Sequence, residues 1–177
     1  MIVSNLDLIT IHSIFVRSYN MIATYPDPSL TTPTNEFDFI NPPEDPAEIA
    51  TTLMQVINNM SLISISANQL RLPYRAFVLR GAENNIVCFN PKIVYSSEES
   101  ELLDEACPSF PGVTVKVKRS KEIRVRFQTP TGVTSTHTFS GLTARAFQHE
   151  LDHLDGVLFY NRANRYHREK ALKNGRR

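Results

Sequence analysis

The stretch Gln148-His149-Glu150-Leu151-Asp152-His153 places two histidines four residues apart, with a glutamate directly after the first. Residues four apart lie on one face of a helix, so His149 and His153 can bind a single metal ion. A metal held in this way lowers the pKa of water, and Glu150 beside it can carry the proton that the water loses. The stretch therefore predicts a helix that holds a hydrolytic metal centre.

The neighbouring residues also favour a helix, running from about Leu142 to Asp155. Apolar side chains precede and follow the histidines at helical spacing, and Gly156 is placed where a helix commonly ends. A bare pair of histidines at this spacing can arise by chance on an amphipathic helix. The glutamate between them makes a chance match rarer.

A catalytic zinc-type site usually has three protein ligands and an open position for water, so a third ligand is needed. The remaining histidines and cysteines are His12, His137, His167, Cys88 and Cys107. Cys88 lies in an apolar run typical of a buried strand, where a small core residue is expected. Cys107 lies between predicted strands in a loop-like segment with two prolines and a glycine. Its thiolate is well placed to complete the site.

Three motifs together resemble those of the peptide deformylase family. Upstream of the helix motif stands Glu105-Ala106-Cys107-Pro108-Ser109, and further upstream stands Leu62-Ile63-Ser64-Ile65-Ser66-Ala67-Asn68-Gln69. Their order and spacing agree with the family over roughly residues 21 to 160. The resemblance implies a metal-dependent hydrolase that removes the formyl group from N-formylmethionyl nascent polypeptides and releases formate.

The resemblance also implies a role for each central side chain. Cys107, His149 and His153 would bind one divalent metal, Glu150 would move protons, and Gln69 would donate a hydrogen bond to the oxyanion. It implies Fe(II) as the native metal, with zinc, nickel or cobalt also able to bind. A thiolate with two imidazoles suits either zinc or Fe(II), so the ligand types do not choose between them.

A groove for the formylated peptide is implied as well, with the methionine pocket lined by Leu142, Ala146 and the stem of Glu105. The residues expected to bind substrate are Ser64, Ile65, Glu105, Pro108, Leu142 and Ala146.

The chain departs from the family pattern at four of these motif positions. Leu62 and Ser64 replace glycines, and Ala106 and Pro108 stand where the family has glycine and often leucine. The family's peptide pairs with backbone at the first two, where glycine allows close approach. The residue after the cysteine normally donates its backbone N–H to the formyl oxygen, and proline has none. We therefore expect an active but slower enzyme.

The rest of the chain predicts an α+β fold, with antiparallel strands packed around the central metal-binding helix. Asp45-Pro46-Ala47-Glu48 is a favourable start for another helix, and a polar loop is expected from Ser96 to Glu101. The strand-like runs are residues 74–79, 86–89, 92–95, 113–118, 122–128 and 133–139.

The 177 residues suffice for one domain, which we place at residues 21–160. Residues 1–20 are expected to be an N-terminal extension or a mis-assigned start, and residues 161–177 a basic tail. A net charge of +1 and no apolar run near the ~18 residues that cross a bilayer favour neither DNA nor membrane as a partner. We expect a cytoplasmic protein, or an organellar one if residues 1–20 are a transit peptide.

The basic tail carries seven Lys or Arg and one acid between Arg162 and Arg177. Such clustered charge suits a contact with ribosomal RNA, although a solvated chain end has the same composition. Two other readings of the whole chain remain open. One is a zinc peptidase of the His-Glu-x-x-His type, and the other is a metal-binding deformylase relative with weak or no turnover that acts as a ribosome-associated module.

Overall fold

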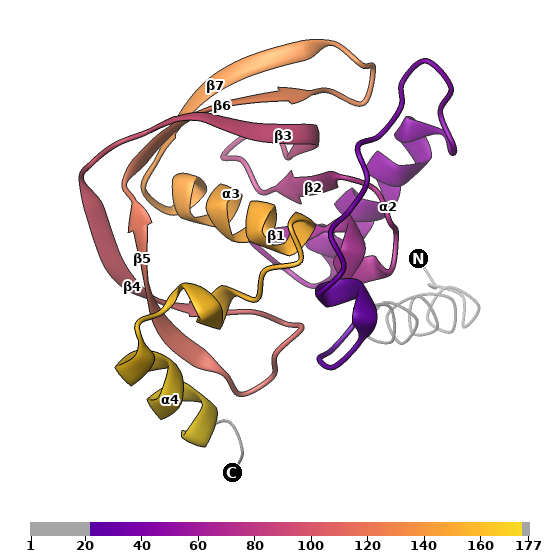
Figure 1. The fold of residues 1–177 in the computed structure, drawn as a ribbon. Coiled ribbons are helices and arrows are strands. Elements are labelled where there is room, and N and C mark those ends of the chain that lie inside the picture. The colour runs from indigo at the N-terminus through magenta and orange to yellow at the C-terminus, as the bar shows by residue number, and fades with distance from the viewer. Residues whose placement is uncertain (1–21, 175–177) are drawn as a thin grey trace, which may run out of the picture.

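Helix α3 (Gly141–Leu154), which carries both histidines of the metal motif, lies at the centre of the protein with strands curved around it (Figure 1). The computed structural model describes residues 22–174. The predicted extension at residues 1–20 lies outside the described residues and stays a prediction. Within residues 22–174, antiparallel strands and helices form an α+β fold, as the sequence predicts.

The strands form two antiparallel sheets. The larger sheet has the order β1-β2-β3-β6-β7, and the smaller one pairs β4 with β5. The strands are β1 (Ser64–Ser66), β2 (Ala76–Leu79), β3 (Ile86–Ser96), β4 (Ser100–Ala106), β5 (Thr114–Ser120), β6 (Glu122–Gln128) and β7 (Thr134–Ser140).

The inner face of the larger sheet packs on α3. Every second residue of β6 is buried, as the two-residue period of a strand dictates when one face meets a core. The ring of Phe147 from α3 meets that of Phe77 from β2 edge to face, with centroids 4.9 Å apart. This packing fixes the helix axis, and with it the direction in which the two histidines point.

Two expectations about strands need correction. The runs predicted at 86–89 and 92–95 are one strand, β3, with an irregularity where Asn90 adopts a left-handed φ of 48° and the register with β6 shifts. The predicted polar loop ends early, because Ser100 already belongs to β4, a strand that the sequence analysis missed. Most of β4 is exposed, so it lacks the alternation of apolar and polar residues on which strand prediction relies.

The first described α-helix, α2 (Pro46–Asn59), begins where the sequence predicts. The Asp45 carboxylate accepts a hydrogen bond from the backbone N–H of Ala47, and Pro46 occupies the first turn. The buried face of α2 packs against β1 and β2 and closes a second part of the core. Strand β1, which carries the first motif, is thereby held between α2 and α3.

The segment predicted as a basic tail is largely helical. A short helix η3 (Phe159–Arg162) is followed by α4 (Arg165–Asn174), which packs beside β5 through the buried Ala171 (Figure 1). The aliphatic residues of α4, Ala171 and Leu172, are adjacent, so the sequence shows little helical periodicity here and its charges dominate. No helix within residues 22–174 is long and apolar enough to span a membrane.

Candidate active site

The last turns of α3 are anchored to segments far away in the sequence. The side-chain amide of Asn68 donates to the backbone carbonyls of His153, at 2.6 Å, and Ser29, at 3.0 Å. The chain then turns at Gly156, whose φ is +69° and where a Cβ would lie 2.7 Å from the carbonyl oxygen of Thr31. Only glycine fits there without a backbone shift, so the end of the metal helix is fixed.

Three buried side chains bring metal-ligand atoms together. The Sγ atom of Cys107, on the turn after β4, lies 3.2 Å from Nε2 of His153. One ligand atom from each of Cys107, His149 and His153 lies within 4.8 Å of the others. The Nδ1 atom of His149 interacts with Glu105 at 3.1 Å, so its Nε2 is left to face the cysteine.

This ligand set fits a divalent metal. A tetrahedral ion with typical bond lengths to sulfur and imidazole nitrogen separates those atoms by roughly 3.5 Å. The 3.2 Å between Cys107 and His153 is close to that spacing. The carboxylate of Glu105 orients the His149 ring through the nitrogen that does not face the site, which is the usual outer arrangement around a metal-bound histidine.

Glu105 is the centre of a buried ion network that joins β4, β5 and α3. It accepts from Arg119 at 2.9 and 3.0 Å and from Arg145 at 2.6 Å. Arg119 also pairs with Asp152 at 2.6 Å, and Arg162 pairs with the other oxygen of Asp152 at 2.7 Å. Burial alone would raise the pKa of Glu105, but the His149 and Arg119 partners outweigh it and lower that pKa to about 2.

The two histidines have opposite electrostatic surroundings. Burial disfavours the charged form of His149, but hydrogen bonds to Cys107 and Glu105 outweigh that effect and raise its pKa to about 10. Burial and the neighbouring His149 and Arg119 lower the pKa of His153 well below its usual value. The surroundings of His149 therefore favour its protonated form, whereas those of His153 favour the neutral form that binds a metal.

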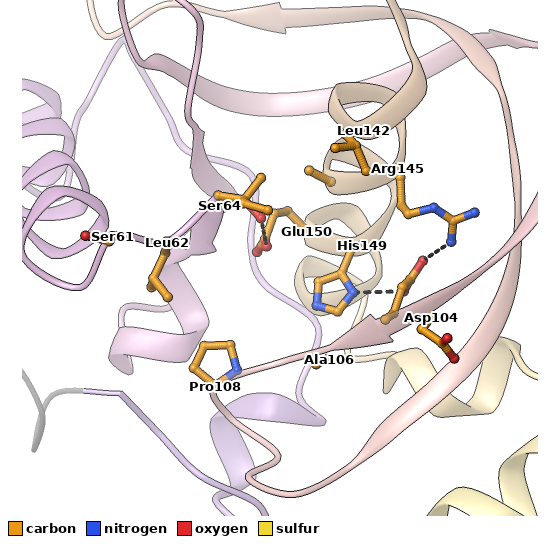
Figure 2. A pocket seen from close by; sticks show the side chains of 13 residues that line it. Ser61, Leu62, Ser64, Asp104, Ala106, Pro108, Leu142, Arg145, His149 and Glu150 are labelled. Carbon is orange, nitrogen blue, oxygen red and sulfur yellow. Dashed lines mark hydrogen bonds and ion pairs between the residues drawn. The ribbon is translucent and has the colours of Figure 1, made fainter.

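Glu150 lines the pocket beside His149 (Figure 2). Its Oε1 atom accepts a hydrogen bond of 2.6 Å from the hydroxyl of Ser64. Its Oε2 atom is buried and makes no hydrogen bond within the described residues. Burial raises the pKa of Glu150, against the opposing effects of His149 and Ser64. A buried carboxylate with one free oxygen is suited to accept a proton.

Gln69 is held with its amide nitrogen toward the ligand set. Its Oε1 atom accepts from the backbone N–H and the hydroxyl of Ser66, at 3.0 and 2.9 Å. Its Nε2 atom donates to the hydroxyl of Ser109 at 2.9 Å and lies 3.4 Å from the Cys107 sulfur. The amide donor predicted from the first motif is thus next to the ligands and buried.

A cavity of about 340 Å³ opens beside Glu150 and His149 (Figure 2). Five of the six residues predicted to bind substrate line it: Ser64, Glu105, Pro108, Leu142 and Ala146. The sixth, Ile65, is fully buried in the core under α2 and does not line it. Alternation along β1 explains the difference, because neighbouring side chains of a strand point to opposite faces. The Ile65 side chain therefore does not face the cavity, and a contact of Ile65 with substrate stays a prediction.

The sequence analysis also missed the groups that support the site, namely Arg119, Arg145 and Asn68. One signal was available for Arg119. In the alternating strand 114–120 it occupies the same face as Val115 and Val117, so a charged residue stood at a position expected to be buried. A buried arginine needs acidic partners, but the strand pattern does not say which ones; the structure identifies them as Glu105 and Asp152.

Comparison with known proteins agrees with this geometry. A model of the polypeptide deformylase family matches residues 19–169. A peptide deformylase from Desulforudis audaxviator is 35% identical over 84% of this chain and 96% of its own. The chloroplastic/mitochondrial peptide deformylase 1B of Arabidopsis thaliana is 34% identical over 80% of this chain and 53% of its own.

Solved structures show the same likeness. The structure of the Arabidopsis thaliana peptide deformylase 1B in complex with an inhibitor superimposes with a TM-score of 0.81 and 31% identity, covering 88% of this chain and 87% of that one. The residues matched by the family model, 19–169, include both sheets and the metal helix. The chain therefore belongs to the polypeptide deformylase family, the metal-dependent hydrolases that remove the formyl group from N-formylmethionyl peptides.

Proposed function

We propose that this peptide deformylase performs its reaction at the centre formed by Cys107, His149 and His153, with Glu150 as the proton carrier. The observation that supports this most is the convergence of the three ligand atoms within 4.8 Å of one another, beside Glu150 at the end of a 340 Å³ cavity. The sulfur and nitrogen atoms come from separate segments, yet all are buried at one place. His149 and Glu150 line the cavity, so a formylated peptide N-terminus lying in it would meet the centre from their side.

The residues divide the work of hydrolysing the formyl amide. A divalent metal held by Cys107, His149 and His153 would lower the pKa of water and polarise the formyl oxygen. The free Oε2 atom of Glu150 accepts the proton that the attacking water loses, and Glu150 then delivers a proton to the departing nitrogen as the C–N bond breaks. The amide of Gln69 donates to the oxygen that gains negative charge. The products are formate and a peptide with a free amino terminus.

We propose Fe(II) as the native metal, with zinc, nickel or cobalt able to bind to the same ligands. A thiolate and two imidazoles can bind any of these four metals. Which metal occupies the site therefore depends on metal availability and on exposure to oxygen. Protein purified without oxygen is expected to contain iron and to lose turnover in air, whereas the nickel form is expected to keep it. Metal analysis before and after exposure to air tests this.

We keep residues 21–160 as the proposed catalytic domain and the cytoplasm as its proposed compartment. The Arabidopsis relative is named a chloroplastic/mitochondrial peptide deformylase. An organellar location of this chain would follow if residues 1–20 act as a transit peptide. Sequencing of the amino terminus of the mature protein tests both points, since removal of these residues would support the organelle.

We also propose that the exposed cations of α4 contact ribosomal RNA. Lys170 and Lys173 are exposed on this helix, whereas Ala171 between them is buried. The pair Lys170→Glu and Lys173→Glu is expected to reduce co-sedimentation with ribosomes at low salt without unfolding the helix. Equal co-sedimentation of the variant and the parent protein would exclude this contact.

Release of formate from formyl-Met-Ala-Ser tests the proposed chemistry directly. The nickel- or iron-loaded protein, prepared without oxygen, is expected to turn over this peptide. Glu150→Gln keeps the volume of the side chain but cannot accept the proton, so turnover is expected to disappear while metal content stays at one ion per chain. Undiminished turnover in Glu150→Gln would show that another group moves the proton.

A relative without efficient turnover is the second candidate, because Pro108 removes one donor and Leu62 replaces a glycine. It predicts full metal binding with no formate release. The zinc peptidase reading has lost its support, since the third ligand, Cys107, precedes the helix and the chain belongs to the deformylase family.

A further inference from the structure

Ser64 occupies a position where the family pattern has a glycine, and its side chain points into the active-site pocket (Figure 2). Its backbone is held by β1, where it pairs with Leu79 of β2. The hydroxyl therefore projects from a fixed point of the sheet. A glycine at this position would present no side-chain hydrogen-bond donor to the pocket.

The hydroxyl of Ser64 contacts the carboxylate of Glu150, which lies 86 residues later in the sequence. It donates to Oε1 at 2.6 Å, a length typical of a strong hydrogen bond to an ionised acceptor. Glu150 is only 2% exposed, so water cannot freely replace this donor. Its second oxygen, Oε2, makes no hydrogen bond within the described residues.

We propose that Ser64 is a positioning residue, which holds Oε1 of Glu150 so that Oε2 is presented to the attacking water and the departing amine. The inference rests on the role proposed for Glu150 and adds to it a residue that the glycine of the family pattern cannot replace. Ser64 acts through the carboxylate and makes no bond to the reacting atoms.

The reason is the freedom of a glutamate side chain. Three rotatable bonds separate its carboxylate from the backbone, and a single fixed donor removes much of that freedom before substrate binds. Loss of the donor allows conformations in which Oε2 does not face the water. Misplacement of a catalytic group lowers the rate of the chemical step, while binding of the peptide stays nearly unchanged.

Three substitutions separate the hydroxyl from the volume of the side chain. Ser64→Gly and Ser64→Ala both remove the donor, and Ser64→Thr keeps it on a residue that suits a strand. In Ser64→Gly and Ser64→Ala we expect kcat for formyl-Met-Ala-Ser to fall by roughly ten-fold, the order of one hydrogen bond to a charged group. KM is expected to stay within about two-fold, and Ser64→Thr is expected to recover most of kcat. Ser96→Gly is the matched control, because it makes the same change on an exposed strand position of β3.

Two further measurements keep the result interpretable. The inhibition constant of the product Met-Ala-Ser reports on the peptide groove without the formyl group, and metal content reports on the ligands; both are expected to be unchanged in Ser64→Gly. A wild-type kcat in both Ser64→Gly and Ser64→Ala would overturn the proposal, as would a kcat in Ser64→Thr as low as in Ser64→Ala. Neither outcome would affect the test of Glu150→Gln, which stands on its own.

Discussion

At the scale of single residues, Pro108 is the departure from the family pattern that we expect to change the rate most. It follows the ligand Cys107 and lines the pocket, yet it has no N–H to offer the formyl oxygen. Gln69 remains as a donor beside the ligands. The sequence alone shows that Pro108 departs from the family pattern, because the neighbouring motif residues identify its position as the one after the cysteine ligand.

Pro108→Leu restores a backbone donor at this place and is expected to raise kcat. Loss of one oxyanion donor typically costs on the order of 10²–10³ in turnover, so a gain of at least ten-fold is a cautious expectation. Steady-state kinetics with formyl-Met-Ala-Ser measure it. Pro111→Leu, an exposed change in the same loop, is the control. The idea fails if kcat of Pro108→Leu equals that of the parent protein.

At the scale of helices and strands, the ion network of Glu105 connects β4, β5 and α3 at the active site. This residue joins β4 to Arg119 of β5 and to Arg145 and His149 of α3. Glu105→Gln removes the charged partner of the buried Arg145 and leaves Arg119 paired with Asp152 alone. Removal of one partner from a buried ion pair typically costs about 3–5 kcal/mol. We expect a loss of that order in the free energy of unfolding at pH 7, measured by urea denaturation of the metal-free protein. Glu101→Gln, an exposed change on the same strand, is expected to stay within about 0.5 kcal/mol.

The same network gives a pH dependence whose sign is set by the lowered pKa of Glu105. Because this pKa is about 2 in the folded protein and 4.5 in the reference state, the stabilisation is complete above pH 4.5 and is lost as the pH falls toward 2. The difference in unfolding free energy between the parent protein and Glu105→Gln should therefore shrink on acidification from pH 5 to pH 3. A difference that grows over this range would contradict the assigned ion pairs.

The sequence predicted the bounds of a helix or strand well where one of its faces is buried and the other is exposed. It predicted them poorly for elements without that contrast. Strand 122–128 alternates strictly and was found with its observed bounds, whereas the mostly exposed β4 was missed. Asn90 interrupts β3 with a left-handed residue, so one strand looked like two. Helix α4 was overlooked, because its charges were read as a tail. The periodic spacing of apolar residues reveals an element when one of its faces packs on the core. The pattern is weak when little of the element is buried.

On the scale of the whole molecule, three distant segments meet at one site. The first motif on β1, the cysteine after β4 and the histidines of α3 were each predicted from sequence, since their spacing matches the family. The groups that hold them in place were not predicted. Asn68 anchors the end of α3, and Arg119 joins Glu105 to Asp152; neither contact follows from spacing along the chain. They depend on how β5 and η2 (Ala67–Leu70) pack on the helix.

The central claim is that one metal ion on Cys107, His149 and His153 performs the deformylation. Titration of the metal-free protein with nickel, followed by both the thiolate-to-metal absorption band and formate release from formyl-Met-Ala-Ser, tests it most directly. Both signals are expected to rise together and to reach a plateau at one equivalent, and Cys107→Ala is expected to abolish both. Full formate release before metal is added, or an absorption band that persists in Cys107→Ala, would contradict the account.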